Sequence, residues 1–114
     1  EGQIASEADI TAFASSDKRL KTNIINIQNP IDKIKKLNGI SFEWKDREVN
    51  EKVMNKTNLG VIAQEVQKVL PEIVKERDDG YLAIKYEQLV PVLIEGMKEQ
   101  QKQIDELKQK LEEL

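Results

Sequence analysis

The chain has 114 residues, a formal net charge of -3, and neither cysteine nor histidine. These two absences exclude disulfides, thiolate metal sites, Ser-His-Asp catalysis and the commonest zinc sites. The charges balance beyond the acidic segment 1–15, so no basic surface for nucleic acid is present, and no apolar run reaches the length of a membrane span. We therefore expect no metal, cofactor, nucleic-acid or membrane partner.

The first third of the chain predicts one helix preceded by irregular chain. Residues 1–15 have no clear period, and we expect them to be a linker or the tail of a preceding domain in a larger protein. Residues 16–28 open with charges and run into isoleucines, which favours a short extended segment. A helix follows, with Asn29 as N-cap and Pro30 as its first residue, and it ends at 38–39.

The middle of the chain alternates between strand and helix signals. Apolar and polar residues alternate over 40–44, the pattern of a half-buried strand. The polar stretch 45–58 predicts a solvated loop, and the short apolar run 59–62 leads into a helix over 63–70 that Pro71 ends. Together these patterns predict a small core of mixed secondary structure.

The remainder predicts a hairpin and one long helix. Apolar residues flank an Asp-Asp-Gly turn over 73–84, where Gly80 supplies a positive φ. Residues 86–114 follow with a heptad pattern, and Gly96 is expected to be a point of close packing. The core positions of that pattern are Val90, Leu93, Met97, Gln100, Ile104, Leu107, Leu111 and Leu114.

Such a narrow apolar stripe between charged flanks is typical of a helix that buries itself against copies of itself. The alternative is that the stripe folds back on its own domain. Mixed Leu, Ile, Met and Gln at the core positions do not choose between two and three strands. The fold class is therefore α+β: a small mixed core of short strands and helices, plus a long C-terminal helix that forms a coiled coil.

Without histidine and cysteine, the candidate nucleophiles are hydroxyls and the candidate bases are lysines and carboxylates. Ser and Lys crowd together only in the segment 15–21. A Ser–Lys dyad is one interpretation, because a lysine with a depressed pKa can activate a serine. A charged surface turn is the other. On a regular helix Ser16 and Lys21 would lie on different faces, whereas Asp17 and Lys21 would form a modest ion pair.

Four segments in order resemble the C-terminal intramolecular chaperones of endosialidases and phage tail-spike or neck-appendage proteins, the peptidase S74 family. They are 16–24 (SDKRLKTNI), 60–66 (GVIAQEV), 70–74 (LPEIV) and 86–93 (YEQLVPVL). Each piece alone is common, but the combination is specific, and it covers about residues 16–110.

The resemblance implies a homotrimer that guides folding of an upstream β-structured stalk of the same polypeptide and then cuts itself off. Carried onto this sequence, the scissile bond is Ser15–Ser16, Ser16 is the nucleophile, Lys21 is the general base, and Asp17 orients the loop. The expected organisation is a linker over 1–15, a chaperone core over 16–85 and a trimeric coiled coil over 86–114.

The expected protein is thus a serine autoprotease that needs no cofactor and acts once, in cis. It would work in the host cytoplasm on the precursor of a viral tail or appendage and be absent from the mature virion. Two alternatives remain: a trimeric cap that stays attached, and the equivalent module of a membrane-tethered transcription factor. Whether Lys21 acts within one chain or across subunits is left open by the sequence.

Overall fold

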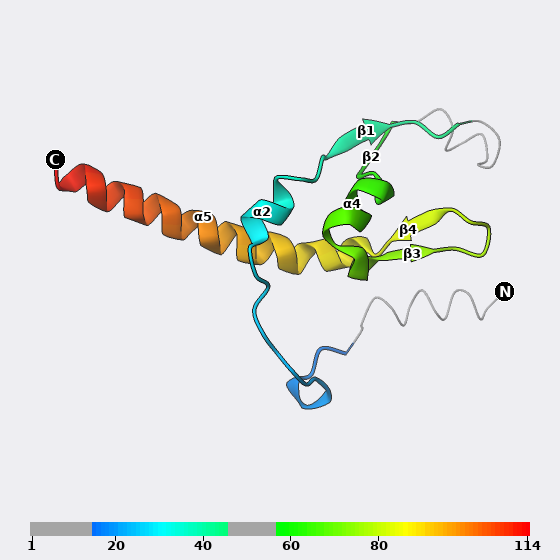
Figure 1. Cartoon of the computed structure of the whole chain (residues 1–114), viewed down its shortest axis with the longest axis horizontal. Helices are drawn as coiled ribbons and strands as arrows, with labels where there is room; N and C mark the ends of the chain where they lie inside the picture. Colours follow the sequence, from blue (N-terminus) through cyan, green and yellow to red (C-terminus); the bar gives the residue numbers. More distant parts are fainter. Residues whose placement is uncertain (1–14, 46–56) are drawn as a thin grey trace.

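The computed structural model describes residues 15–45 and 57–114, and it confirms the predicted α+β class (Figure 1). The helices are α2 (Pro30–Ile34), α4 (Ala63–Val69) and α5 (Leu89–Glu112), with 3-10 turns η1 (Lys18–Leu20), η2 (Pro71–Ile73) and η3 (Tyr86–Gln88). The strands are β1 (Ile40–Phe42), β2 (Asn58–Gly60), β3 (Val74–Glu76) and β4 (Leu82–Ile84).

The four strands form two separate antiparallel pairs. In the first pair Ile40 faces Gly60, and in the second Val74 faces Ile84. The turn of the second pair has Gly80 at φ 88°, the left-handed backbone that glycine adopts without steric cost. The predicted hairpin over 73–84 is therefore confirmed. The predicted loop over 45–58 lies mostly outside the described residues.

A small apolar core holds these elements together. Among the described residues only four hydrophobic residues are buried, and they come from α4, the residue that links it to η2, η2 itself and α5: Val66, Leu70, Ile73 and Val92. The predicted helix over 63–70 is confirmed, because α4 ends at Val69 and Pro71 opens η2. A core of this size gives an isolated domain little stability, so association with another surface would add substantially to it.

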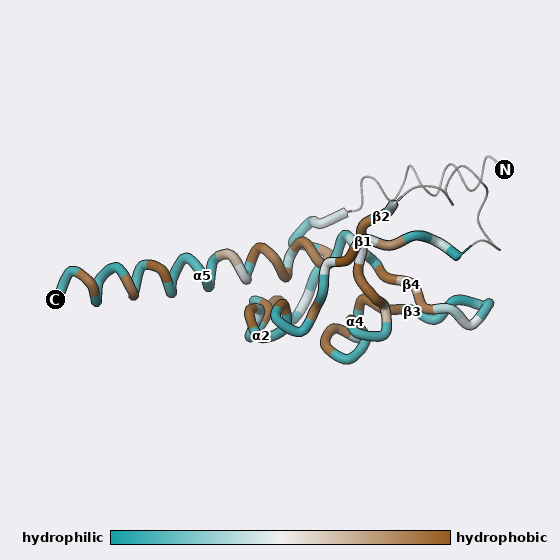
Figure 2. Tube along the Cα trace, turned by 90° about the horizontal axis from the view of Figure 1, so that it is seen from above, coloured by the Kyte–Doolittle hydropathy of each residue, from teal (hydrophilic) through white to brown (hydrophobic). Residues whose placement is uncertain are grey.

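Helix α5 has two apolar faces with different surroundings. Its first half packs against α2, with Gly96 beside Ile34, and against the core, to which it contributes Val92 and the neighbouring Leu89. No residue after Gly96 is buried, and the second half of the helix extends away from the core (Figures 1 and 2). The expected close packing at Gly96 is confirmed, because a Cβ there would clash with Ile34 Cδ1.

Two local predictions in the first third are wrong in detail. Helix α2 ends at Ile34 instead of at 38–39, with a turn over Lys35 and Lys36. Asn29 takes the N-cap position, but at φ 53° its side chain makes no capping hydrogen bond. The chain enters α2 through a left-handed residue, a conformation that asparagine tolerates better than most residues. Over 16–28, where a short extended segment was predicted, the only regular element is η1.

Candidate functional site

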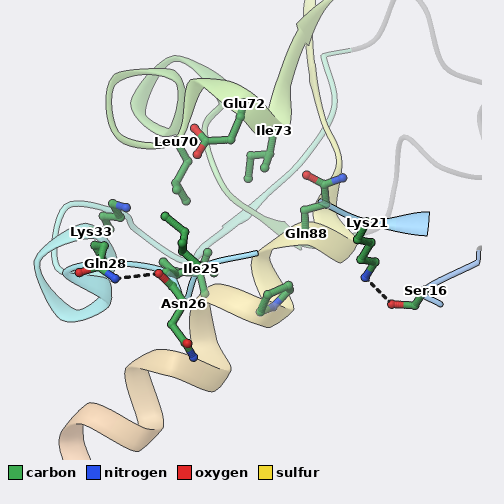
Figure 3. Close-up of a pocket in the computed structure, with 13 residues that line it drawn as sticks. Ser16, Lys21, Ile25, Asn26, Gln28, Lys33, Leu70, Glu72, Ile73 and Gln88 are labelled. Atoms are coloured by element: carbon green, nitrogen blue, oxygen red, sulfur yellow. Dashed lines mark hydrogen bonds between the residues drawn. The ribbon is translucent and has the colours of Figure 1, made fainter. Parts of the chain in front are cut away.

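The predicted dyad is assembled within a single chain. Lys21 Nζ donates a hydrogen bond to Ser16 Oγ at 2.7 Å, and both side chains are exposed (Figure 3). A 3-10 turn between the two residues makes this possible, because it tightens the backbone more than an α-helix would. The backbone N–H of Lys21 closes the turn on the carbonyl of Lys18 at 3.1 Å.

Asp17 begins this turn as its N-cap. One of its carboxylate oxygens accepts the backbone N–H of Arg19 at 2.9 Å, which is the local hydrogen bond expected of an aspartate at a turn. The Arg19 guanidinium binds the same carboxylate with Nε and Nη2, at 3.1 and 2.9 Å. The Arg19 side chain, and then its N–H, lower the pKa of the Asp17 carboxyl, while Asp17 raises the pKa of Arg19.

The turn lies at the end of an arm, apart from α2 and α4 in Figure 1. Asn23, at φ 54°, bends the chain between the dyad and the core. The arm is fastened at its base, where Asn26 Nδ2 donates to Glu95 Oε1 of α5 at 3.3 Å. Ile27 then packs against the buried core residues. The dyad is thus held by its own local turn, and the core fixes only the base of the arm.

A groove with a volume of about 640 Å³ runs from the dyad along the base of the arm. Figure 3 shows Ser16 and Lys21 at one edge and Lys33 and Glu72 elsewhere around it. Its lining includes the buried core side chains Leu70, Ile73 and Val92. The groove therefore places an apolar surface beside the candidate nucleophile.

The predicted seam of α5 is exposed along its whole length in the single chain. Met97 is 72%, Leu107 60% and Leu114 100% accessible to solvent. The other core positions are exposed as well: Val90, Leu93, Gln100, Ile104 and Leu111. At about 100° of rotation per residue, this seam lies roughly 90° around the helix from the Val92–Gly96 face. The face of α5 that packs on its own domain is therefore the Val92–Gly96 face, and the seam is not covered by the same chain.

Two of these contacts were missed by sequence reasoning. Helical spacing paired Asp17 with Lys21, whereas the structure pairs Asp17 with Arg19; an aspartate two residues before an arginine in a turn could have indicated this. The Asn26–Glu95 contact joins residues 69 apart, and no local pattern predicts it. Among the described residues, no three potential ligands gather into a metal site, and no helix is long and apolar enough to cross a membrane.

Comparison with known families gives the geometry its context. The family model described as the chaperone of endosialidase, peptidase S74, matches residues 16–75, which begins at Ser16 and includes the whole dyad turn. The chain belongs to this family. The predicted resemblance is therefore confirmed.

The chain is also similar to several phage proteins, each of which is named long tail fiber protein Gp37. It is 33% identical to that of Enterobacteria phage K3 over 96% of this chain and 9% of the relative. The protein of Salmonella phage S16 is 33% identical over 88% of this chain and 14% of its own length. That of Escherichia phage AR1 is 39% identical over 60% of this chain and 6% of the relative. The chain thus spans about a tenth of the length of these fibre proteins.

Proposed function

We propose that this chain is a self-cleaving intramolecular chaperone of a phage tail fibre. It trimerises through the seam of α5, assists folding of an upstream β-structured stalk in the same polypeptide, and separates from it at the Ser15–Ser16 bond. Residues 16–85 form the chaperone core, 86–114 the coiled coil and 1–15 the connection to the stalk. Assembly takes place in the host cytoplasm, and the mature virion lacks the chaperone.

The observation that carries the proposal is the 2.7 Å contact between Lys21 Nζ and Ser16 Oγ. Nucleophilic catalysis by serine requires a base within hydrogen-bond reach of the hydroxyl, and this contact meets that requirement within one chain. Family membership and the fibre names of the relatives agree with it. Asp17 holds the turn and takes no proton in the reaction.

The reaction follows from this arrangement. A neutral Lys21 amine accepts the Ser16 hydroxyl proton while Ser16 Oγ attacks the carbonyl carbon of Ser15. The C–N bond then breaks, the Ser16 nitrogen takes the proton back from Lys21, and an ester joins Ser15 to Ser16 Oγ. Water hydrolyses the ester, leaving a carboxylate on Ser15 and a free amino group on Ser16. No cofactor is needed.

Trimerisation and cleavage act in sequence on the folding of the stalk. A long stalk of three intertwined chains must bring those chains into register before its contacts repay the entropy of alignment. A seed with an exposed apolar seam on α5 supplies that register. Removal of the seed after folding then closes the route by which the stalk would unfold, so the persistence of the fibre becomes kinetic.

The test is expression of the chain behind its upstream stalk, or behind an N-terminal tag, followed by denaturing electrophoresis. We expect two bands and a C-terminal product whose mass begins at Ser16. Ser16→Ala and Lys21→Ala should each abolish the second band, and Lys18→Ala, which removes a lysine that does not contact Ser16, should leave it. Cleavage of both dyad variants at the parental rate would contradict the proposal that the chain is an autoprotease.

A cap that trimerises without cleaving is the second candidate, and one observation favours it. Both dyad side chains are exposed in the single chain, whereas a lysine base is normally desolvated so that its amine is neutral. Light scattering separates the outcomes for assembly, since a trimer has three times the 13.1 kDa chain mass. A trimer that never cuts Ser15–Ser16 supports the cap, and a monomer at micromolar concentration contradicts both.

A further inference from the structure

Arg19 donates hydrogen bonds to both carboxylate oxygens of Asp17. Its Nε and its backbone N–H both donate to Oδ1, and its Nη2 donates to Oδ2 at 2.9 Å. A guanidinium that binds both oxygens of a carboxylate gives a more directional contact than an ammonium can. Both side chains are nevertheless exposed, with 87% of Arg19 and 41% of Asp17 accessible, so the pair adds little to the stability of the fold.

Without that contact, Asp17 would have another cation within reach. Lys21 Nζ already reaches the side chain of Ser16, the residue next to Asp17, so a carboxylate released from Arg19 would compete with Ser16 Oγ for the same amine. The remaining charged side chain of the turn is Lys18, and the groove is lined by two more, Lys33 of α2 and Glu72 of η2, which lie away from the dyad in Figure 3. A lysine paired with a carboxylate keeps its proton, and a protonated lysine cannot accept one from a serine hydroxyl.

We propose that Arg19 is a positioning residue for self-cleavage: by holding both oxygens of Asp17, it leaves Lys21 on Ser16 Oγ. The inference rests on the proposed autoproteolytic function and adds a residue to it. Asp17 is anionic at any pH at which a lysine could act as a base, because the ordinary pKa of its carboxyl, 3.8, already lies far below that range and Arg19 lowers it further. A carboxylate released from Arg19 would therefore stay charged, and able to bind the Lys21 ammonium, throughout the working range.

The experiment measures the cleavage rate of the tagged chain against pH, for the parent and for three variants. In Arg19→Ala the freed carboxylate captures Lys21. We expect the midpoint of the pH–rate profile to rise by about 0.3–0.5 unit and the rate at neutral pH to fall about two- to threefold. The shift should shrink at high salt, because both charges are exposed.

Two further variants separate this role from a merely structural one. Asp17→Ala combined with Arg19→Ala removes the competing carboxylate, so the midpoint should return to the parental pH even if the loosened turn lowers the maximal rate. Lys18→Ala removes one positive charge from the same turn but keeps the Asp17–Arg19 contact, so its midpoint should shift less than that of Arg19→Ala.

The inference is overturned if the double variant keeps the raised midpoint, or if Arg19→Ala and Lys18→Ala shift it equally. Either result would leave the proposed function intact, provided that Ser16→Ala and Lys21→Ala still abolish cleavage. Cleavage by Lys21→Ala at the parental rate would instead remove the proposed function, whatever Arg19 does. The two failures are therefore distinguishable in one set of measurements.

Discussion

The contact between α5 and α2 at Gly96 makes a quantitative prediction. A Cβ added at Gly96 would clash with Ile34 Cδ1, while Ile31 Cδ1 would lie at an ordinary contact distance of 3.8 Å. Gly96→Ala should gain about 1 kcal/mol of helix propensity but lose about 1–3 kcal/mol to overpacking. We expect net destabilisation of up to about 2 kcal/mol.

Ile34→Val removes the methyl group that Gly96→Ala would meet. Alone it should cost about 0.5–1.5 kcal/mol, as a cavity-forming substitution. In the double variant the new methyl at 96 fills the vacated space and the helix gains its propensity, so stability should return to within about 0.5 kcal/mol of the parent. The two changes should therefore be coupled by about 1 kcal/mol or more.

Urea unfolding of the four proteins at one fixed chain concentration provides the assay, since association contributes to apparent stability. Ile31→Val combined with Gly96→Ala is the matched control, because it removes the equivalent methyl from a side chain that does not clash. That pair should be additive. Additivity for Ile34→Val as well, within about 0.3 kcal/mol, would refute the packing argument.

Three other predictions concern the contact between the end of β2 and η3, the seam and the dyad turn. Tyr86→Phe removes the phenolic oxygen that accepts the Val61 N–H at 3.3 Å, and should cost about 1 kcal/mol in urea unfolding; no change would show that water replaces it. Leu107→Lys places a charge in the exposed seam and should shift light scattering towards monomer, whereas Gln109→Lys, outside the seam, should not. Because the folded turn lowers the pKa of Asp17, its contribution is present above the ordinary value of 3.8 and is lost as pH falls through the lowered one. The NMR shift of the Arg19 amide should therefore stay native at pH 4 and move only in stronger acid; a midpoint at 3.8 or above contradicts the pairing.

Local patterns predicted most of the fold. Helix α4 and the β3–β4 hairpin follow from short-range signals: apolar spacing, Pro71, and a glycine at the turn. Helix α2 was predicted too long because its apolar spacing continues to Leu37, while the backbone leaves the helix at Lys35. Periodicity alone sets no helix end where neither glycine nor proline interrupts it.

The sequence placed the candidate residues in one short segment but did not give all of their contacts. The family motif named Ser16 and Lys21 as a pair, and their spacing counted against a regular helix; the structure brings the two side chains into hydrogen-bond contact across a 3-10 turn, while their catalytic roles stay a proposal. The partner of Asp17 was wrong because an i, i+4 rule applies only on an α-helix. The second apolar face of α5, at Val92 and Gly96, was not separated from the seam, because tertiary packing on α2 decides which stripe is covered.

The hydrogen bond between Lys21 and Ser16 closes within six consecutive residues. A loop of about ten residues closes in roughly 10–100 ns, whereas subunit assembly takes milliseconds to minutes. If the chain cleaves itself, the meeting of nucleophile and base therefore cannot set the time of release. The delay has to come from a later event, such as the exclusion of water from the Lys21 amine by a neighbouring copy. The dyad turn would then form early in folding and become active in cleavage only after assembly.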